Sequence, residues 1–402
     1  MDYAGHGDPT QMSHESVLKL TDFADFRNTN LPLWVTASCD IMPFDGLEAN
    51  IGEYALLNDK GGAVAFYGTT RTVYAQYNRH INRAFIHRVL SLVDGKPITI
   101  GEAHRLAQND LVSGNGPTSG SDVTVNHLHY SLLGDPALAL NLPMHQIVVD
   151  SINGIPVAGA ATLPMLKAGS IARMAGHIEG ADDFRGVITA TVRDSKETVT
   201  CRLNDTGKDG AEKAFEYKDR TKTLFQGTDS VRGGKFTFSF AVPLDINYSN
   251  QSGLVNLYAV NTAKTLSAHG SSEQFTVGES EEQKNDSIGP SIYCYLNSPS
   301  FVDGGNVNTT PFFVAKITDK DGINAAGSGI GHDLQLVIDG DMSKSYVLNS
   351  NFIYDFGTYT SGSTYYSIPQ LEPGKHELTF RAWDIQNNSS TVKLRFNVVK
   401  GL

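Results

Sequence analysis

The chain has 402 residues, 40% of them hydrophobic, and it carries a formal net charge of −11. This length predicts two or three domains with ordinary cores, and the acidic balance without a basic stripe argues against a nucleic-acid partner. No apolar run approaches the ~20 residues of a membrane-spanning helix. Three cysteines in three different regions, without a C-x-x-C pair, favour neither a disulfide framework nor structural zinc.

Strand signals come first along the chain. Residues 1–7 read as the end of a strand that runs into a functional loop, so we expect the chain to begin inside a domain. Residues 33–38 (LWVTAS) and 63–67 (AVAFY) are short continuous apolar runs, which are typical of strands buried on both faces of a parallel sheet. Together with the helices between them, these runs predict an α/β domain over residues 1–145.

Three helices are predicted in the same domain. Apolar residues recur with helical spacing over residues 47–57 and 73–93. Thr99 is predicted to cap a third helix, with Glu102 as its capping-box partner. Residues 113–121, rich in Gly, Ser, Thr and Asn, are predicted to form an exposed loop before the domain ends.

The pattern changes from about residue 146 onwards. Residues 187–192 (VITATV) and 235–240 (KFTFSF) are typical of short strands, turn clusters separate them, and no long helix is predicted. The last third of the chain has the same character, and the polar, acidic residues 280–287 are predicted to form a linker. We therefore expect two all-β immunoglobulin-like sandwich modules, residues 146–280 and 281–402.

Two short segments carry the residues with the most chemistry, Gly5-His6-Gly7 and Cys39. In a doubly wound sheet, reactive groups sit where strands end and loops meet the crevice, and both segments follow strand ends. A thiol needs a nearby base or imidazolium to become a good nucleophile at neutral pH. The N–H groups of Gly7 and Cys39 are candidates for an oxyanion hole. This arrangement predicts cysteine-based acyl transfer.

Both segments also have ordinary structural interpretations. A cysteine after an apolar strand is usually a small buried hydrophobe, and a Gly-His-Gly sequence can be only a turn. The spacing of the two segments therefore leaves two alternatives, a thiol–imidazole pair or two unrelated structural residues.

Three segments resemble the gingipain family of cysteine peptidases. YAGHGDPTQ (residues 3–11) and LPLWVTASCDIMPFDG (residues 31–46) resemble the family's catalytic region, in which one strand ends in a Gly-His-Gly histidine and the next ends in the nucleophile. HYSLLGDPALAL (residues 129–140) resembles the segment that closes many catalytic domains of the family. The resemblance implies a caspase-like α/β fold, present here as the C-terminal part of a catalytic domain.

The resemblance also implies roles for individual residues. Cys39 matches the family's nucleophile and His6 matches its catalytic histidine. The acidic residue that orients the histidine belongs to the first half of the family's domain, which this sequence lacks. Asp8 and Asp40 are nearby carboxylates, but neither matches that acid.

The β modules extend the resemblance. Residues 217–249, 313–339 and 377–402 resemble the modules that follow the catalytic domain in the family's cell-surface sortases of the type IX secretion system. This implies an enzyme at the outer face of the bacterial outer membrane that removes the C-terminal sorting domain of secreted cargo. It transfers the cargo to an amine of a lipopolysaccharide acceptor, or to water. The implied partners are the cargo, a PorV-like outer-membrane barrel and the lipopolysaccharide acceptor, and neither a metal nor an organic cofactor is implied.

Two other functions stay open from the sequence. One is a non-catalytic assembly or adhesion scaffold, in which the β modules bind partners and the peptidase half is degenerate. The other is an ordinary secreted endopeptidase of the gingipain type, which differs from a sortase only in its acceptor and its tethering. The presence of both His6 and Cys39 favours an enzyme.

Other residues suggest lesser candidate sites. His14, His127 and His129 are candidates for a metal site with Asp8 or Glu15, although such histidines are more often polar loop residues. No ligand motif supports this candidate.

A calcium site is a further candidate, formed by Asp303, Asp319 and Asp321. Because no glutamate follows at the twelfth position, a hairpin turn explains these residues better.

Substrate specificity is the least determined property. Phe44, Tyr67, Thr69 and Tyr74 are expected to lie beside the crevice and shape the pocket. Residues 41–43 after the nucleophile are apolar and offer no acid, which argues against a preference for arginine or lysine.

Overall fold

The computed structural model of the chain describes residues 1–113, 123–201, 213–282, 286–326 and 331–401. The chain forms two compact units, Met1–Leu142 and Pro143–Leu402. The predicted loop at residues 113–121 lies almost entirely outside the described residues. No helix among the described residues is long and apolar enough to span a membrane.

A four-stranded sheet in the order β1-β4-β5-β8 forms the centre of the N-terminal unit. Its strands are β1 (Asp2–Ala4), β4 (Leu33–Ala37), β5 (Ala65–Thr69) and β8 (Tyr130–Gly134). β1, β4 and β5 run parallel, and β8 pairs antiparallel with β5. Both predicted strands are therefore confirmed. The second begins at Ala65, two residues later than predicted, because the Ala63 N–H donates a hydrogen bond to the Ala55 carbonyl of the preceding helix.

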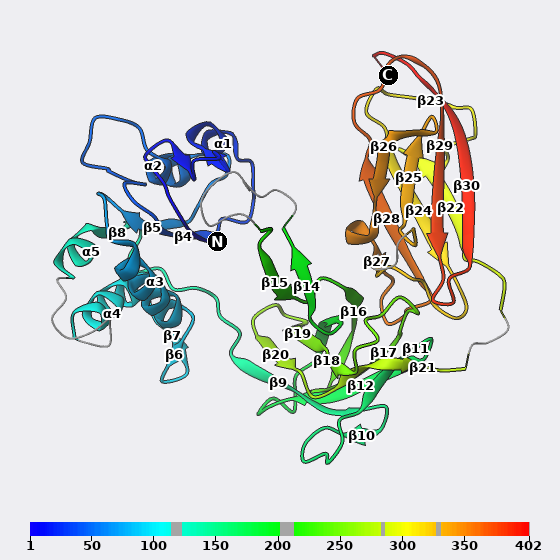
Figure 1. Ribbon diagram of the computed structural model, residues 1–402, viewed down its shortest axis with the longest axis horizontal. Helices are drawn as coiled ribbons and strands as arrows, with labels where there is room; N and C mark the ends of the chain where they lie inside the picture. The colour runs from blue at the N-terminus through cyan, green and yellow to red at the C-terminus, as the bar shows by residue number, and fades with distance from the viewer. Residues whose placement is uncertain (114–122, 202–212, 283–285, 327–330, 402) are drawn as a thin grey trace. The chain divides into compact units, whose positions relative to one another are not determined.

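Helices cover both faces of this sheet (Figure 1). They are α1 (Leu20–Asp25), α2 (Ile51–Leu57), α3 (Ala75–Val89), α4 (Ile100–Val112) and α5 (Thr124–His129). Alternate strand residues point to opposite faces. Val35 and Tyr67 join the core beneath α3 and α4, whereas Trp34 and Phe66 join the core beneath α1 and α2. The continuous apolar runs thus correspond to strands buried on both sides, as predicted.

Local signals explain where the helices begin and end. Thr99 caps α4, and its Oγ1 accepts a hydrogen bond from the Glu102 N–H at 3.1 Å. The Glu102 carboxylate bonds to Arg105 instead of returning to Thr99, so only half of the predicted capping box forms. α3 ends at Val89, earlier than predicted, because a short hairpin follows it.

Two small hairpins complete the N-terminal unit. They are β2–β3 (Gln11–Met12 with Leu18–Lys19) and β6–β7 (Leu92–Val93 with Lys96–Pro97). In the second, Asp94 and Gly95 both have positive φ, +51° and +71°. An Asp-Gly pair with this geometry is the usual connection of a two-residue hairpin.

The first β module has one large sheet. Its strands in spatial order are β10 (Ile155–Pro156), β9 (His145–Ile152), β12 (Ile171–Ile178), β17 (Lys235–Ala241), β16 (Thr223–Arg232), β13 (Gly186–Arg193), β19 (Leu254–Asn261) and β20 (Ser267–Ser272). β20 also pairs with β9, so the ladder of strands closes on itself. The remaining strands are β11 (Met165–Ala168), β14 (Glu197–Thr200), β15 (Glu216–Asp219), β18 (Gln251–Ser252) and β21 (Thr276–Ser280).

The second β module has two main sheets. One contains β22 (Ser291–Leu296), β24 (Phe312–Thr318), β28 (Ser361–Ser367) and β27 (Ile353–Tyr354). The other contains β23 (Asn306–Val307), β30 (Ser389–Val398), β29 (Gly374–Trp383), β25 (Gln335–Ile338) and β26 (Asp341–Val347). Side chains from both sheets meet in the core, where the rings of Phe313 and Phe380 lie 5.2 Å apart.

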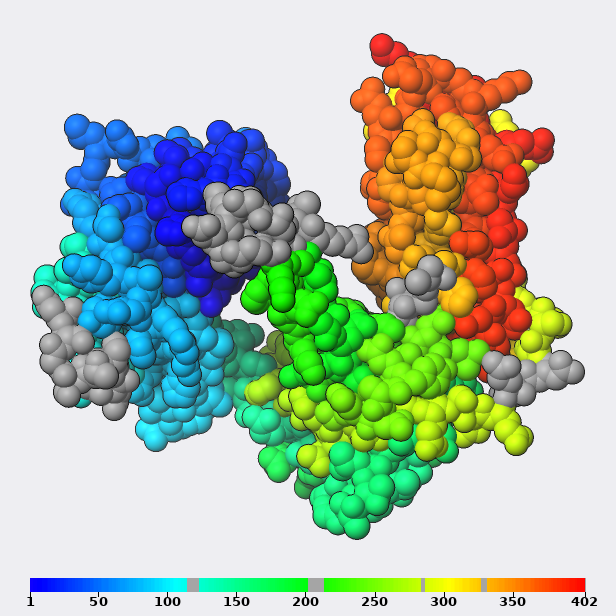
Figure 2. Space-filling view, in the orientation of Figure 1, coloured from blue at the N-terminus to red at the C-terminus, as the bar shows by residue number. Residues whose placement is uncertain are grey.

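The C-terminal unit is mostly β structure, as predicted. One hydrophobic cluster contains residues from both β modules, for example Phe225 and Tyr354, whose ring centroids lie 5.1 Å apart. In the described part of this unit the single helical segment is a 3₁₀ turn, Asn349–Asn351. Figure 2 draws the first module mainly in green and the second in yellow to red.

Candidate active site

Two neighbouring parallel strands of the N-terminal unit end at the same edge of the sheet. Ala4 of β1 pairs with Ala37 of β4, and the Gly5 N–H donates to the Ala37 carbonyl at 3.2 Å. His6 and Cys39 each lie two residues beyond the Ala4–Ala37 pair. Both line a pocket of about 500 Å³, called the Cys39 pocket below. The structure therefore brings together the two residues proposed from the sequence.

The His6 backbone is held from two sides. Its carbonyl oxygen accepts hydrogen bonds from the Tyr3 hydroxyl at 2.6 Å and from the Ser13 N–H at 2.8 Å. The His6 side chain is exposed, and its ring stacks on the ring of His14 with centroids 5.2 Å apart and an interplanar angle of 8°. The sequence suggested His14 only as a metal ligand, whereas the structure places it against the candidate base.

Cys39 is half-buried at the start of a sharp turn. Its Sγ lies 3.5 Å from the Val73 carbonyl oxygen. Asp40, the next residue, has a left-handed backbone with φ +48°, a conformation that aspartate tolerates better than most residues. The Asp40 carboxylate accepts a hydrogen bond from the Thr72 hydroxyl at 2.7 Å. The turn after Cys39 is thus fixed to the loop that leads into α3.

The two backbone donors predicted for an oxyanion hole have no acceptor in the part of the chain that the structure describes. Neither the Gly7 nor the Cys39 N–H forms a hydrogen bond with any described residue. Gly7 also packs too closely for a side chain, because a Cβ there would lie 2.9 Å from Ser38 Oγ and 3.1 Å from Ile41 Cδ1. The Ser38 hydroxyl is itself buried and has no hydrogen-bond partner among the described residues. Donors left unpaired beside a nucleophile suit a developing oxyanion.

The carboxylates near the Cys39 pocket have other partners. Asp8 accepts hydrogen bonds from the Thr10 and Gln11 N–H groups. Burial alone would raise the pKa of Asp8, but these hydrogen bonds outweigh it and hold the pKa below its ordinary value. Asp2 accepts a hydrogen bond from Asn82 Nδ2 at 3.1 Å. Among the described residues no carboxylate is hydrogen-bonded to the His6 ring.

Helix α3 contributes a polar wall to the Cys39 pocket. Its lining residues are Asn78, Arg79, Asn82 and Arg83. Sequence reasoning found α3 from its apolar residues but missed this second face of the helix. The sequence did contain one signal for this face. Arg79 and Arg83 are four residues apart, a spacing that places both side chains on the same face of a helix.

The residues expected to shape the pocket lie elsewhere. Tyr67 belongs to the core, where its ring stacks on Phe85 at 3.8 Å, and burial raises the pKa of its hydroxyl far above the ordinary value. That expectation was wrong because Tyr67 occupies a β5 position that faces α3 and α4. Thr69 is buried and donates to the Ser38 carbonyl at 2.6 Å, so it supports the Cys39 segment from behind. Phe44 and Tyr74 are exposed.

The candidate metal ligands are dispersed. Within the described residues no group of three or more His, Cys, Asp or Glu side chains is arranged to hold a metal ion. The ring of His129 lies 3.2 Å from the Thr72 carbonyl oxygen. His127, two residues earlier, lies on the short helix α5.

The candidate calcium ligands have structural roles. Asp319 accepts hydrogen bonds from the N–H groups of Asp321 and Gly322, as in an ordinary turn. Asp303 forms an ion pair with Arg395 at 2.6 Å. The turn interpretation of this segment is therefore the better one.

Comparisons with known proteins support a peptidase origin for the N-terminal unit. Residues 1–141 match the model of peptidase family C25. The crystal structure of dimeric latent PorU from Porphyromonas gingivalis is 31% identical in sequence, with a TM-score of 0.43. The match covers 85% of this chain and 32% of PorU, so the chain spans about a third of that protein.

Other solved structures are more distant. A structure described only as a protease is 13% identical, with a TM-score of 0.29, and the match covers 67% of this chain and 53% of that one. Red sea bream transglutaminase is 10% identical, with a TM-score of 0.19, and the match covers 63% and 31%. Similarities this low say nothing about the function of the chain. No curated protein matches the chain.

The family match and the geometry concern the same residues. The matched segment spans almost all of the N-terminal unit, and it contains both His6 and Cys39 at the ends of adjacent parallel strands. The N-terminal unit of this chain belongs to peptidase family C25, the gingipain-like cysteine peptidases.

Proposed function

We propose that this chain is part of a cell-surface sortase, a cysteine transpeptidase that processes cargo of the type IX secretion system. The observation that carries the proposal is the position of His6 and Cys39, which follow the paired ends of β1 and β4 and line one pocket. The sequence identity with PorU supports the sortase assignment over an ordinary endopeptidase, because it extends over 85% of the chain and thus beyond the peptidase unit.

The proposed reaction has two halves. The Cys39 thiol gives its proton to His6, and the sulfur attacks the carbonyl carbon of the cleaved peptide bond. The N–H groups of Gly7 and Cys39 stabilise the oxyanion. The C–N bond breaks, the leaving amine takes the proton from His6, and an acyl thioester remains on Cys39. An acceptor amine or water then attacks the thioester, His6 accepts the acceptor's proton, and the Cys39 sulfur is released.

The partners and location are part of the same proposal. The substrate is secreted cargo with a C-terminal sorting domain, and the acceptor is a lipopolysaccharide-linked amine at the outer face of the outer membrane. A PorV-like outer-membrane barrel anchors the enzyme and delivers cargo. The two β modules, which we propose to be immunoglobulin-like, provide the surface for these partners, and the caspase-like fold is proposed for the complete catalytic domain.

Trapping of the acyl-enzyme tests this function in the intact protein. A cargo peptide is incubated with wild type, Cys39→Ala and His6→Ala, and the protein mass is measured after acid quenching. We expect an acyl adduct on Cys39 in wild type and none in either variant. Adding a primary amine should divert part of the acyl thioester from the acid product to an amide product, which identifies a transpeptidase.

Each alternative function has its own outcome in this experiment. Cleavage that gives only the acid, even with excess amine, supports an ordinary endopeptidase. Absence of any adduct and of any cleavage in wild type contradicts an enzyme and favours a scaffold built on the β modules.

A further inference from the structure

The Cys39 pocket has an unbalanced positive charge. Arg79 and Arg83 of α3 line it together with His6 and Cys39, and no aspartate or glutamate among the described residues lines it. Both arginines are exposed, and neither forms an ion pair or hydrogen bond with any described residue. Two guanidinium groups without a partner beside a nucleophile provide donors for an anion.

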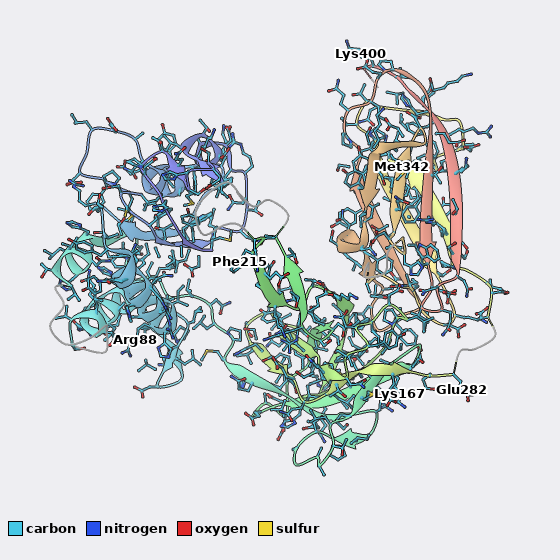
Figure 3. All side chains as sticks on the ribbon, in the orientation of Figure 1. Arg88, Lys167, Phe215, Glu282, Met342 and Lys400 are labelled. Atoms are coloured by element: carbon cyan, nitrogen blue, oxygen red, sulfur yellow. The ribbon has the colours of Figure 1, made fainter. Side chains whose placement is uncertain are left out.

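Other arginines in the same unit are paired. Arg71 bonds to Asp45 at 2.7 Å, and Arg105 bonds to Glu102 at 2.6 Å. Arg88, which lies on α3 (Figure 3), bonds to Asp110 at 2.8 Å. In a chain with a net charge of −11, carboxylates are abundant. Within the described N-terminal unit, the lack of an acidic partner for Arg79 and Arg83 is therefore specific to the face of α3 beside Cys39.

One acid lies close enough to be considered. Asp2 lines the adjoining pocket together with Arg83, and Asn82 donates a hydrogen bond to it at 3.1 Å. Asp2 does not line the Cys39 pocket itself. The adjoining pocket is also lined by Arg88 and Asp110, so its charge is nearly balanced, in contrast to the Cys39 pocket.

We propose that the Cys39 pocket selects substrates with a carboxylate side chain on the residue that precedes the cleaved bond, with Arg79 and Arg83 as the specificity-determining residues. This inference rests on the proposed function, because it concerns the peptide attacked by Cys39. The residue whose carbonyl is attacked lies nearest the sulfur, so its side chain is the one that this pocket receives.

The positive charge of the pocket attracts acidic substrate side chains and repels basic ones. A guanidinium binds a carboxylate through two parallel N–H donors, which a neutral amide reproduces poorly. Lysine or arginine at the same substrate position meets two like charges, so the pocket discriminates against basic side chains. The absence of an acid among residues 41–43, noted in the sequence, agrees with this exclusion.

Three peptide acyloxymethyl ketone probes test the inference on the intact protein. They differ only in the residue next to the reactive carbonyl, which is Asp, Asn or Lys. We expect the Asp probe to label Cys39 about tenfold faster than the Asn probe, and the Lys probe to be slowest. Because these probes react without an acceptor amine, any preference belongs to the peptide and not to the acceptor.

Arginine variants identify the groups responsible. In Arg79→Gln/Arg83→Gln the ratio of the Asp-probe rate to the Asn-probe rate should fall to about one, and Arg79→Glu/Arg83→Glu should favour the Lys probe. Arg105→Gln is the matched control, since it removes an exposed helical arginine far along the sequence on α4 and should leave every ratio unchanged.

The outcomes separate the inference from the function on which it rests. Equal labelling by the Asp and Asn probes in wild type, or a ratio that survives the double Gln variant, overturns the charge selection while Cys39 remains the nucleophile. If no probe labels Cys39, both the charge selection and the proposed function fail.

Discussion

Cys39 and Cys294 are the same residue type in two different strand environments. Cys39 follows the end of a parallel strand, is half-buried, and lines a pocket with His6. Cys294 lies in the middle of β22, where it pairs with Ala315 of an antiparallel neighbour and is only 7% exposed. Burial raises the pKa of the Cys294 thiol to about 12. None of the three cysteines forms a disulfide within the described structure.

The difference shows that position along a strand decides what a cysteine can do. In the middle of a strand, both neighbours are tied into the ladder and the thiol packs as a small hydrophobe. Beyond a strand end, the backbone turns away from the sheet. Here the N–H groups of Gly7 and Cys39 have no acceptor among the described residues. The same edge collects residues from separate segments because parallel strands end side by side.

Removing His6 should have the largest effect on the difference in reactivity between Cys39 and Cys294. In His6→Ala we expect the rate of Cys39 labelling by a peptide ketone probe to fall by about 10²-fold or more, as for loss of a general base. Labelling of Cys294 should not change. His87→Ala is the control, because His87 is an exposed histidine on α3 that does not line the Cys39 pocket. A rate for His6→Ala equal to that of His87→Ala would break the proposed pairing.

Gly7→Ala tests the close packing behind the oxyanion donors. The new Cβ meets Ser38 Oγ, so we expect a loss of about 1–3 kcal/mol in the free energy of unfolding and a labelling rate reduced at least about tenfold. Calorimetry and probe labelling measure the two effects.

Ser38→Ala provides the matched double-mutant cycle. By itself it removes a buried hydroxyl that has no hydrogen-bond partner among the described residues, so the free energy of unfolding should change by less than about 1 kcal/mol. Combined with Gly7→Ala it should restore part of the lost stability and rate. If the two substitutions are simply additive, the contact between residues 7 and 38 does not shape the site.

His14→Ala should have a moderate effect, because the His14 ring stacks on the His6 ring and His14 does not line the Cys39 pocket. Stacked aromatic pairs contribute about 0.5–1.5 kcal/mol, which corresponds to a decrease in labelling rate of about twofold to tenfold. His14→Phe should restore most of the rate, because it keeps the stacking. A His14→Phe variant as slow as His14→Ala would contradict a positioning role.

The buried Cys294 thiol should affect the stability of the protein only at alkaline pH. Its folded pKa, about 12, lies above the ~8.5 of an unfolded thiol. The resulting stabilisation is present below the unfolded pKa and is lost as pH rises toward 12, with a slope of at most about 1.4 kcal/mol per pH unit. Between pH 9 and 11, the Tm of wild type should therefore fall more steeply than that of Cys294→Ala. Parallel curves would show that Cys294 is not held as a buried thiol.

Local sequence signals determined much of the fold. The apolar runs predicted β4 and β5, the helical spacing predicted α3, and Thr99 predicted the start of α4. The Asp94-Gly95 hairpin was missed although it carried a recognised turn signal. The pairing of β20 with β9 depends on contacts far apart in sequence, which local patterns do not contain.

The site was predicted only in part. His6 and Cys39 were predicted because each follows a strand end and because the segments around them resemble the catalytic region of the gingipain family. The structure confirms that β1 and β4 end side by side at one edge of the sheet. Tyr67 was misplaced because the face of a strand residue depends on register, which a short run does not determine. Arg79 and Arg83 were missed because which face of α3 lines a pocket is decided by the packing of the whole unit.

The most direct test of the central claim is the rate of alkylation of each cysteine by iodoacetamide in the folded, intact protein at pH 7, followed by mass spectrometry. We predict that Cys39 reacts at least about 100-fold faster than Cys294, and that His6→Ala removes most of this advantage. If Cys39 reacts no faster than Cys201 and Cys294, the strand-end cysteine is not activated and the proposed catalytic pair is wrong.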